Sequence, residues 1–381
     1  MRPVSRILFT GDIFRTVAGE SNQITNIIWL KKLVEDCIRE ITDLPISIAY
    51  DMDLVTYGVE TVTPLYKNLE LPPSLDAWAK IYNVTDVSQA LCELVVSPIS
   101  DAILVVFEMP PILQVILDKA EIPWIAIELD PLRFLPDLIL NFRFSSHFSI
   151  ASHAGLVTNR QVKAAVKHIK QKSKRELGFD SEGAFIFFAQ TEKDKTLIKG
   201  DSFLAPESVL EFVAGHSAGR KLFVKPHPLS ASNPVVELLK ARLNGDIIQG
   251  VSAYDILSAS SDVTILTSSS SIYYEAIAFG KTAYRQHGAV QDLAFSGSKS
   301  LWAHYSPSFW SALLKNVVPS VAQSKTRYLS EPKSNSIRKQ LGFYGLDPET
   351  WSDSHSLEAD GLMRWIHRVF MTRTSQSQRH N

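Results

Sequence analysis

Two polar turns in the second half of the chain could hold an anionic ligand. Lys225 and His227 stand in the sequence KPHP after the apolar run KLFV, and Pro226 and Pro228 would stiffen the turn that presents them. The run Thr267–Ser271 follows VTIL and opens an amphipathic stretch, so its hydroxyls and backbone N–H groups could bind a phosphate. Neither turn is a glycine-rich dinucleotide loop or a Walker loop, which disfavours NAD and ATP.

Within the serine-rich run, Ser269 and Ser270 are the best candidates for phosphate contacts, with Thr267 and Ser268 supporting them. Glu275 lies about one helical turn further along and could hold ribose hydroxyls. Each turn alone could be ordinary, a solvated proline turn or a serine helix cap. Two anion-binding strand ends in one α/β unit together predict a cleft for a nucleoside monophosphate or diphosphate.

Acidic residues follow two further apolar runs. Gln190 and Asp194 belong to QTEKD after AFIFFA, where a carboxylate could act as a base, a nucleophile or a partner of an oxocarbenium ion. A solvated charged loop is the ordinary alternative. Glu108 ends the run AILVVF, where apolar neighbours would suit it to acid–base chemistry. Arg133 and Asp137 lie in an apolar stretch that favours a structural ion pair supporting the site.

Alternating strands and helices must position these residues. β-Branched and aromatic runs predict strands at Arg6–Thr10, Ile46–Tyr50, Ala102–Phe107, Trp124–Ile127, Ala184–Ala189, Lys221–Val224, Asp246–Gln249, Val263–Leu266 and Thr282–Arg285. Amphipathic stretches predict helices between them, at Asn22–Ile41, Ser88–Val95, Pro111–Ala120, Ala151–Leu177, Pro206–Ala214, Pro234–Leu243, Ala253–Ser258 and Ser271–Phe279. In such sheets ligands bind beyond the carboxyl ends of the strands, where the motifs above fall.

This alternation predicts an α/β protein of the GT-B type, with two Rossmann-like doubly wound domains. We expect an acceptor-side domain at residues 1–178 and a nucleotide-sugar domain at 179–345. Helices at 346–381 should pack back on the first domain as a C-terminal helical return. Because this last segment interleaves Trp and Phe with Arg and His, it could also contact a membrane surface or a partner transferase.

The amino-acid composition excludes several classes of protein. The 381 residues are 45% hydrophobic and 21% charged with a formal net charge of −1, which is typical of a soluble globular protein without a nucleic-acid partner. Cys37 and Cys92 are too few for a disulfide framework or a cysteine metal site. The N-terminus lacks a signal-peptide pattern, and the apolar window Ala102–Leu117 is too short to span a bilayer. We expect a cytoplasmic protein that could lie at the inner face of the bacterial inner membrane.

The blocks FAQTEKDKTLIKGDSF, KLFVKPHP and TSSSSIYYEAIAFGK resemble bacterial β-Kdo transferases of the KpsC and WbbB types, mainly over residues 185–285. FEMPP and DPLRFLPDLILNFR in the first half give weaker support. The resemblance implies a GT-B fold and CMP-Kdo as the donor substrate, with no cofactor and no metal. It also implies retaining transfer of Kdo to a glycan or glycolipid acceptor in O-antigen or capsule synthesis.

The resemblance assigns roles to individual residues. Asp194 would be the nucleophile and Glu108 the acid–base group on the acceptor side. Lys225 and His227 would hold the phosphate with the serines, and Glu275 would lie near the ribose. Lys193 and Lys195 flank Asp194 and could either bind ligand or mark an exposed loop.

Other readings of the same motifs stay open. The His-Pro and serine-rich turns also resemble those of CMP-dependent bacterial sialyltransferases, so a sialyl- or polysialyltransferase is an alternative. CDP-glycerol-dependent teichoic-acid polymerases combine similar turns, but resemble a DYSS-type pattern, whereas Thr267 precedes the serines here. A catalytically silent binding domain of a larger enzyme is a third possibility, against which the intact Asp194 argues.

Overall fold

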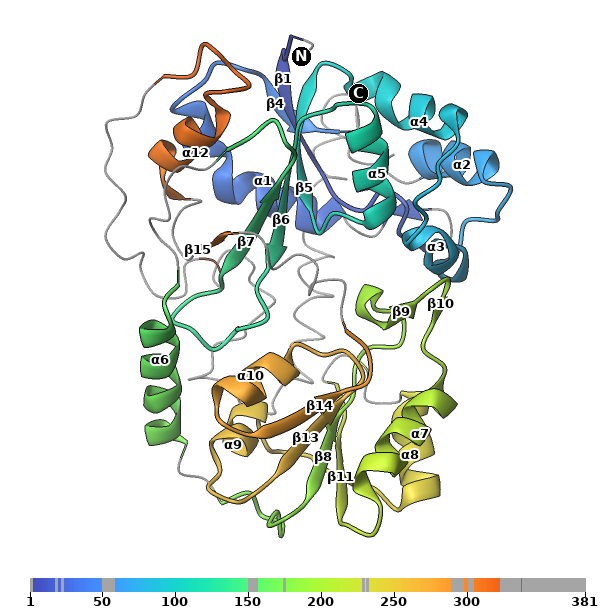
Figure 1. Cartoon of the computed structure of the whole chain (residues 1–381), viewed down its shortest axis with the longest axis vertical. Helices are drawn as coiled ribbons and strands as arrows, with labels where there is room; N and C mark the ends of the chain where they lie inside the picture. The colour runs from blue at the N-terminus through green and yellow to red at the C-terminus, as the bar shows by residue number, and fades with distance from the viewer. Residues whose placement is uncertain are drawn as a thin grey trace, which may run out of the picture.

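The computed structural model describes residues 3–17, 20–21, 24–49, 59–149, 157–173, 176–227, 230, 233–288, 298–300, 305–322 and 337. Within these ranges one main sheet has six strands and the other has five, and helices surround each (Figure 1). We call the elements around the larger sheet the first lobe and those around the smaller sheet the second lobe. The predicted α/β class with parallel sheets is confirmed. The GT-B assignment stays a prediction.

The first sheet is mixed. Its strand order is β15-β7-β6-β5-β1-β4, with β1 (Arg6–Thr10), β4 (Ile46–Ile48), β5 (Ala102–Phe107), β6 (Trp124–Leu129), β7 (Leu140–Phe144) and β15 (Ser298–Ser300). β4, β1, β5 and β6 are parallel, whereas β7 is antiparallel to both β6 and β15. This antiparallel edge differs from the purely parallel sheet that was expected. β5 and β6 are buried along their whole length, which explains their unbroken apolar sequences.

Helices cover the first sheet on both faces. They are α1 (Ile24–Arg39), α2 (Val59–Asn68), α3 (Leu75–Tyr82), α4 (Gln89–Val96), α5 (Pro111–Lys119) and α12 (Pro307–Leu314). Figure 1 shows α12 and α5 on opposite sides of this sheet. The side chains of Ser74 and Ser88 accept hydrogen bonds from the first turns of α3 and α4, which fixes where these helices begin. In the described part of the chain no helix has the length and apolar character needed to cross a membrane.

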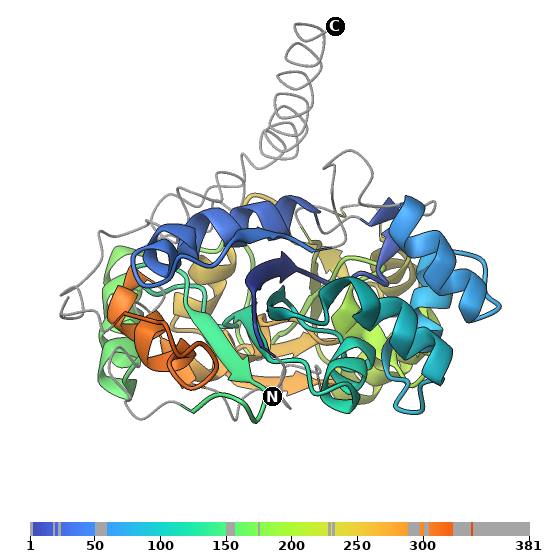
Figure 2. The same cartoon turned by 90° about the horizontal axis from the view of Figure 1, so that it is seen from above.

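The chain returns to the first lobe by Ser298. β15 pairs with β7, and α12 buries Phe309, Trp310 and Leu313 in the core of the first lobe. The view from above shows α12 next to β7 (Figure 2), and the rings of Phe142 and Phe309 are 5.0 Å apart between centroids. This return falls inside the range 179–345 that the sequence assigned to the second domain. The predicted C-terminal helices at 346–381 lie outside the described residues.

The second sheet is fully parallel. Its order is β12-β11-β8-β13-β14, with β8 (Phe185–Phe188), β11 (Leu222–Lys225), β12 (Asp246–Ile247), β13 (Thr264–Thr267) and β14 (Thr282–Arg285). The helices are α6 (Asn159–Lys172), α7 (Pro206–Ser217), α8 (Pro234–Leu243), α9 (Ala253–Ser258) and α10 (Ile272–Ala278). Along β8, Phe185 and Phe187 enter the core under α7 and α8, while Ile186 and Phe188 enter the core on the other face. This alternation makes the second sheet doubly wound, as predicted.

Each lobe lends apolar side chains to the core of the other. The hairpin of β9 (Ile198–Lys199) and β10 (Ser202–Phe203) follows β8, yet Ile198 is buried in the core of the first lobe. In the opposite direction, Phe134, Leu135 and Ile139 follow β6 and are buried in the core of the second lobe. The lobes are therefore interlocked at two places.

Candidate active site

A cavity of about 340 Å³ lies where strand ends of both lobes meet, and we call it the central cavity. The loops after β1 and β5 line it from the first lobe, and those after β8, β11 and β13 line it from the second lobe. Seven of the predicted site residues lie on its wall: Glu108, Arg133, Gln190, Asp194, His227, Ser269 and Ser270. Residues far apart in the sequence thus converge at the carboxyl ends of the strands, as parallel sheets require.

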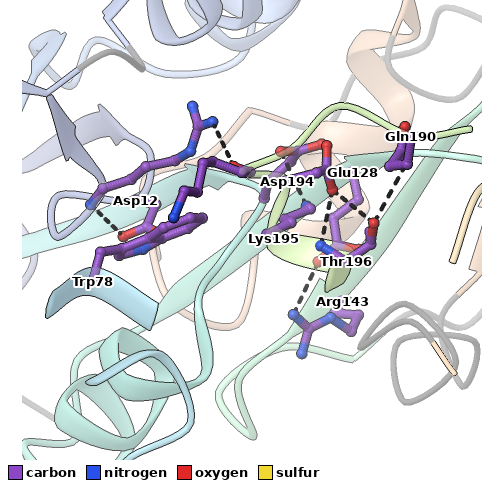
Figure 3. A network of polar contacts seen from close by, with 11 residues as sticks. Asp12, Trp78, Glu128, Arg143, Gln190, Asp194, Lys195 and Thr196 are labelled. Atoms are coloured by element: carbon purple, nitrogen blue, oxygen red, sulfur yellow. Dashed lines mark hydrogen bonds and ion pairs between the residues drawn. The ribbon is translucent and has the colours of Figure 1, made fainter. Parts of the chain in front are cut away.

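Asp194 is held through one of its two carboxylate oxygens. It begins a 3₁₀ turn, and its Oδ1 accepts hydrogen bonds from Thr196 N at 2.8 Å and Thr196 Oγ1 at 2.7 Å (Figure 3). Thr196 Oγ1 is also 2.9 Å from Ser269 Oγ, which couples this turn to the serine-rich turn. Within the described residues Oδ2 makes no hydrogen bond. An oriented carboxylate with one uncommitted oxygen on a cavity wall suits a nucleophile.

An ion pair joins the lobes beside Asp194. Lys195 Nζ lies 3.0 Å from Glu108 Oε2, and the two side chains are only 17% and 24% exposed. Burial opposes the charge on Lys195, but the carboxylates of Glu108, Glu128 and Asp194 outweigh it and raise the pKa of Lys195. Lys195 therefore stays protonated. Behind the pair, Glu128 binds Arg143 at 3.1 Å (Figure 3).

The backbone of Glu108 is strained. Its φ is 52°, in the left-handed region that non-glycine residues adopt at a cost of about 1–2 kcal/mol. Glu70, Glu121 and Asn244 share a positive φ, but each follows a helix, where a left-handed residue commonly ends the last turn. Glu108 instead follows a strand and donates its N–H to Ile127 O at 3.0 Å. Strain of this kind often accompanies a functional position.

One acidic residue on the wall, Asp12, was not predicted from the sequence. Asp12 is 4% exposed and accepts hydrogen bonds from Phe14 N at 3.0 Å, Arg15 N at 3.2 Å and Trp78 Nε1 at 2.8 Å (Figure 3). Burial raises the pKa of Asp12 to about 6, although these hydrogen bonds and Arg15 oppose the rise. Arg15 stacks on the Trp78 ring at 5.2 Å and reaches Lys193 O at 3.4 Å. The available signal was the position of TGD after β1, parallel to that of Glu108 after β5.

The KPHP turn contributes a neutral group to the cavity. Burial lowers the pKa of His227 to about 4, and Arg133 acts in the same direction while Asp194 opposes it. The imidazole is therefore uncharged near neutral pH and can donate or accept a hydrogen bond. Lys225 is the last residue of β11 and is not on the wall of the central cavity among the described residues. Pro228 lies outside the described residues.

The side chains of the serine-rich turn point in different directions. Thr267 is fully buried, and its Oγ1 accepts the N–H of Ser270 at 3.1 Å, which shapes the turn. Ser269 and Ser270 face the central cavity. Ser268 instead lines a neighbouring cavity on the side of α7 and α8. The predicted phosphate contacts of Ser269 and Ser270 thus have suitable positions, and their roles stay predictions.

Glu275 joins the two lobes, whereas Asp137 binds backbone groups of the first lobe. Glu275 is 4% exposed, and its Oε1 accepts Arg133 N at 2.8 Å and Tyr254 Oη at 3.0 Å. Burial raises the pKa of Glu275 to about 7 against the effect of these hydrogen bonds and of the Arg133 charge. Asp137 is fully buried and accepts Leu138 N and Ile337 N, each at 2.8 Å. Neither carboxylate is on the wall of the central cavity.

Comparisons with known proteins leave the family open. No family model matches the chain, and no curated protein does. Among solved structures, KpsC of Thermosulfurimonas dismutans, a β-Kdo 2,7 transferase, is similar over 74% of this chain and 80% of that chain. The identity is 15% and the TM-score 0.35, which establishes neither fold nor activity for this chain. Within the described ranges no group of three or more His, Cys, Asp or Glu side chains could hold a metal ion.

Proposed function

We propose that this protein is a retaining glycosyltransferase that moves Kdo from CMP-Kdo to a glycan acceptor of a bacterial surface polysaccharide. The sequence resemblance over residues 185–285 supports the donor. One observation supports the reaction type: Asp194 is fixed through Oδ1 beside the Lys195–Glu108 pair, in a cavity lined by both lobes. A nucleophile and a separate acid–base group are what a double displacement needs.

The first displacement would use the second lobe. Ser269 and Ser270 would donate hydrogen bonds to the phosphate of CMP, and the neutral imidazole of His227 would add another. Oδ2 of Asp194 then attacks the anomeric carbon. The bond between that carbon and the phosphate oxygen breaks, and its electron pair leaves with CMP. The product is a glycosyl ester of Asp194 with inverted configuration.

The second displacement would use the first lobe. An acceptor hydroxyl attacks the anomeric carbon of the ester, and the Asp194 carboxylate leaves with the electron pair. Glu108, on the cavity wall and 3.0 Å from Lys195 Nζ, would take the hydroxyl proton. Two inversions give net retention. The proposal includes no cofactor and no metal ion; hydrogen bonds from Ser269, Ser270 and His227 would stabilise the departing phosphate.

Intact-mass measurement after incubation with CMP-Kdo tests the nucleophile. We expect an adduct of one Kdo unit on the wild type without acceptor, and a longer-lived adduct on Glu108→Gln once acceptor is added. Asp194→Ala should show no adduct and no transfer. Asp180→Ala is the matched control, because this acid of the second lobe is 77% exposed and its ion-pair partner among the described residues is the distant Lys221, at 3.7 Å. Full transfer by Asp194→Ala would remove the nucleophile from the proposal.

Donor choice is tested by offering CMP-Kdo, CMP-sialic acid and CDP-glycerol separately and measuring release of CMP. We expect turnover of CMP-Kdo. Turnover of CMP-sialic acid alone would identify a sialyltransferase, and turnover of CDP-glycerol alone a glycerophosphotransferase. The expected position at the inner face of the inner membrane belongs to the same proposal, because CMP-linked donors are made in the cytoplasm. Fractionation of the native host tests this position.

A further inference from the structure

A second cavity, of about 400 Å³, lies beside the central one. We call it the side cavity. It is bounded by α3 of the first lobe, the β9–β10 hairpin, and the beginnings of α7 and α8. Its volume falls within the range of small-molecule sites.

The two cavities share a wall. Trp78 of α3 faces the central cavity, whereas its neighbour Ala79 faces the side cavity. The serine-rich turn behaves alike, since Ser269 faces the central cavity and Ser268 the side cavity. Gln190 lines both. A ligand in the side cavity would therefore lie against the residues that hold the reacting groups.

Ser268 and Gln190 place hydrogen-bonding side chains on the wall of the side cavity. Ser268 is 3% exposed and lines the cavity. The Gln190 amide is weakly engaged, with Nε2 at 3.5 Å from Thr196 Oγ1 and Oε1 at 3.3 Å from Thr191 N. A hydroxyl and a weakly held amide on the cavity wall could donate to and accept from a polar ligand.

The walls are apolar and the rim is not basic. Phe187, Phe203, Leu204, Pro206 and Val209 supply most of the wall. Three acidic side chains stand at the rim against two lysines, namely Asp76, Glu192 and Asp201 against Lys80 and Lys193. One of the lysines is already committed, since Lys193 binds Asp76 at 2.6 Å and lies 4.7 Å over the Phe203 ring. This charge balance disfavours a phosphate or a carboxylate.

We propose that the side cavity binds a neutral sugar unit of the acceptor glycan. A sugar ring has apolar C–H faces that pack on such walls. Its hydroxyls can donate to and accept from Ser268 and Gln190, and can donate to the rim carboxylates. The choice of a neutral saccharide follows from the cavity itself. Its assignment to the acceptor rests on the proposed transferase function and on the wall shared with Asp194 and Gln190.

Saturation-transfer NMR on the full chain tests this inference. The probes are methyl glycosides of glucose, galactose, mannose, rhamnose and N-acetylglucosamine, with methyl glucuronide and CMP as charged comparators. Ala205→Trp fills the cavity from an exposed position at the start of α7, and Ala218→Trp places the same side chain at the other end of that helix. Ser268→Ala removes only the hydroxyl.

We expect at least one neutral glycoside to bind the wild type and Ala218→Trp. Its Kd should rise about tenfold or more in Ala205→Trp and by a smaller factor in Ser268→Ala. Unchanged glycoside binding in Ala205→Trp overturns the proposal, and so does the absence of neutral glycoside binding to the wild type. If Ala205→Trp loses CMP binding but keeps glycoside binding, the side cavity binds the nucleoside instead. If the wild type binds glycosides but not CMP, the proposal for the side cavity stands and the proposed CMP-Kdo transferase activity is refuted.

Discussion

Glu275 should make the stability of this protein fall as the pH rises. Its pKa is raised from 4.5 to about 7 by burial, so between these values the folded chain holds a proton that the unfolded chain has released. Its contribution to stability is therefore complete below pH 4.5 and is lost as the pH rises through about 7. A pKa raised by about 2.5, at about 1.4 kcal/mol for each pKa unit, corresponds to roughly 3 kcal/mol.

Glu275→Gln isolates this effect, because the glutamine keeps an acceptor oxygen for Arg133 N and Tyr254 Oη but cannot ionise. Urea unfolding of both proteins at several pH values is the assay. We expect similar free energies of unfolding near pH 4.5 and a variant more stable by up to about 3 kcal/mol at pH 8. Other titrating groups cancel in this difference. A stability difference that does not change with pH would refute the reasoning.

Three further predictions concern the central cavity. Lys195→Met leaves the Glu108 carboxylate without its cation and should lower the free energy of unfolding, measured in urea, by about 3 kcal/mol. The double variant Lys195→Met/Glu108→Gln should regain much of this loss. Equal losses in the single and double variants would contradict the ion pair. Trp78→Phe removes the donor to Asp12 and should cost about 1–3 kcal/mol and raise the pKa of Asp12 above about 6, measured by unfolding and by carboxyl NMR shifts. The His227 imidazole should stay neutral from pH 8 to about 5 in nitrogen-15 spectra, and a titration near 6.5 would show that it is solvated.

Much of the fold could be predicted because the strands are short, apolar and separated by turn residues. The bounds of β1, β5, α8 and α9 coincide with those expected. β7 was not predicted, because LNFRF continues the apolar run of Leu138 and Ile139 and was not separated from it. The basic helix expected at Ala151–Leu177 is shorter, since α6 begins at Asn159, where Thr158 and Gln161 form a capping box.

The site was predictable where one strand end supplies one motif. Asp194, Glu108, His227, Ser269 and Ser270 all lie on the central cavity for that reason. Contacts between distant segments carry no local signal. Asp12 and Trp78 are 66 residues apart in the sequence. The sequence of the short helix α3 does not indicate that Trp78 donates a hydrogen bond to an aspartate. The opposite orientations of Ser268 and Ser269 depend on the backbone of one turn, which composition does not encode.

Because the lobes exchange apolar side chains, neither lobe should be stable without the other. If Ile198 and Phe203 leave the first lobe, or Phe134 and Leu135 leave the second, the remaining core loses buried surface that nothing else replaces. The lobes should therefore melt together in one calorimetric transition, with equal calorimetric and van't Hoff enthalpies. Fragments cut at residue 178 should each expose apolar surface to water and recover structure only when mixed. We therefore expect the two halves of the chain to unfold as one cooperative unit.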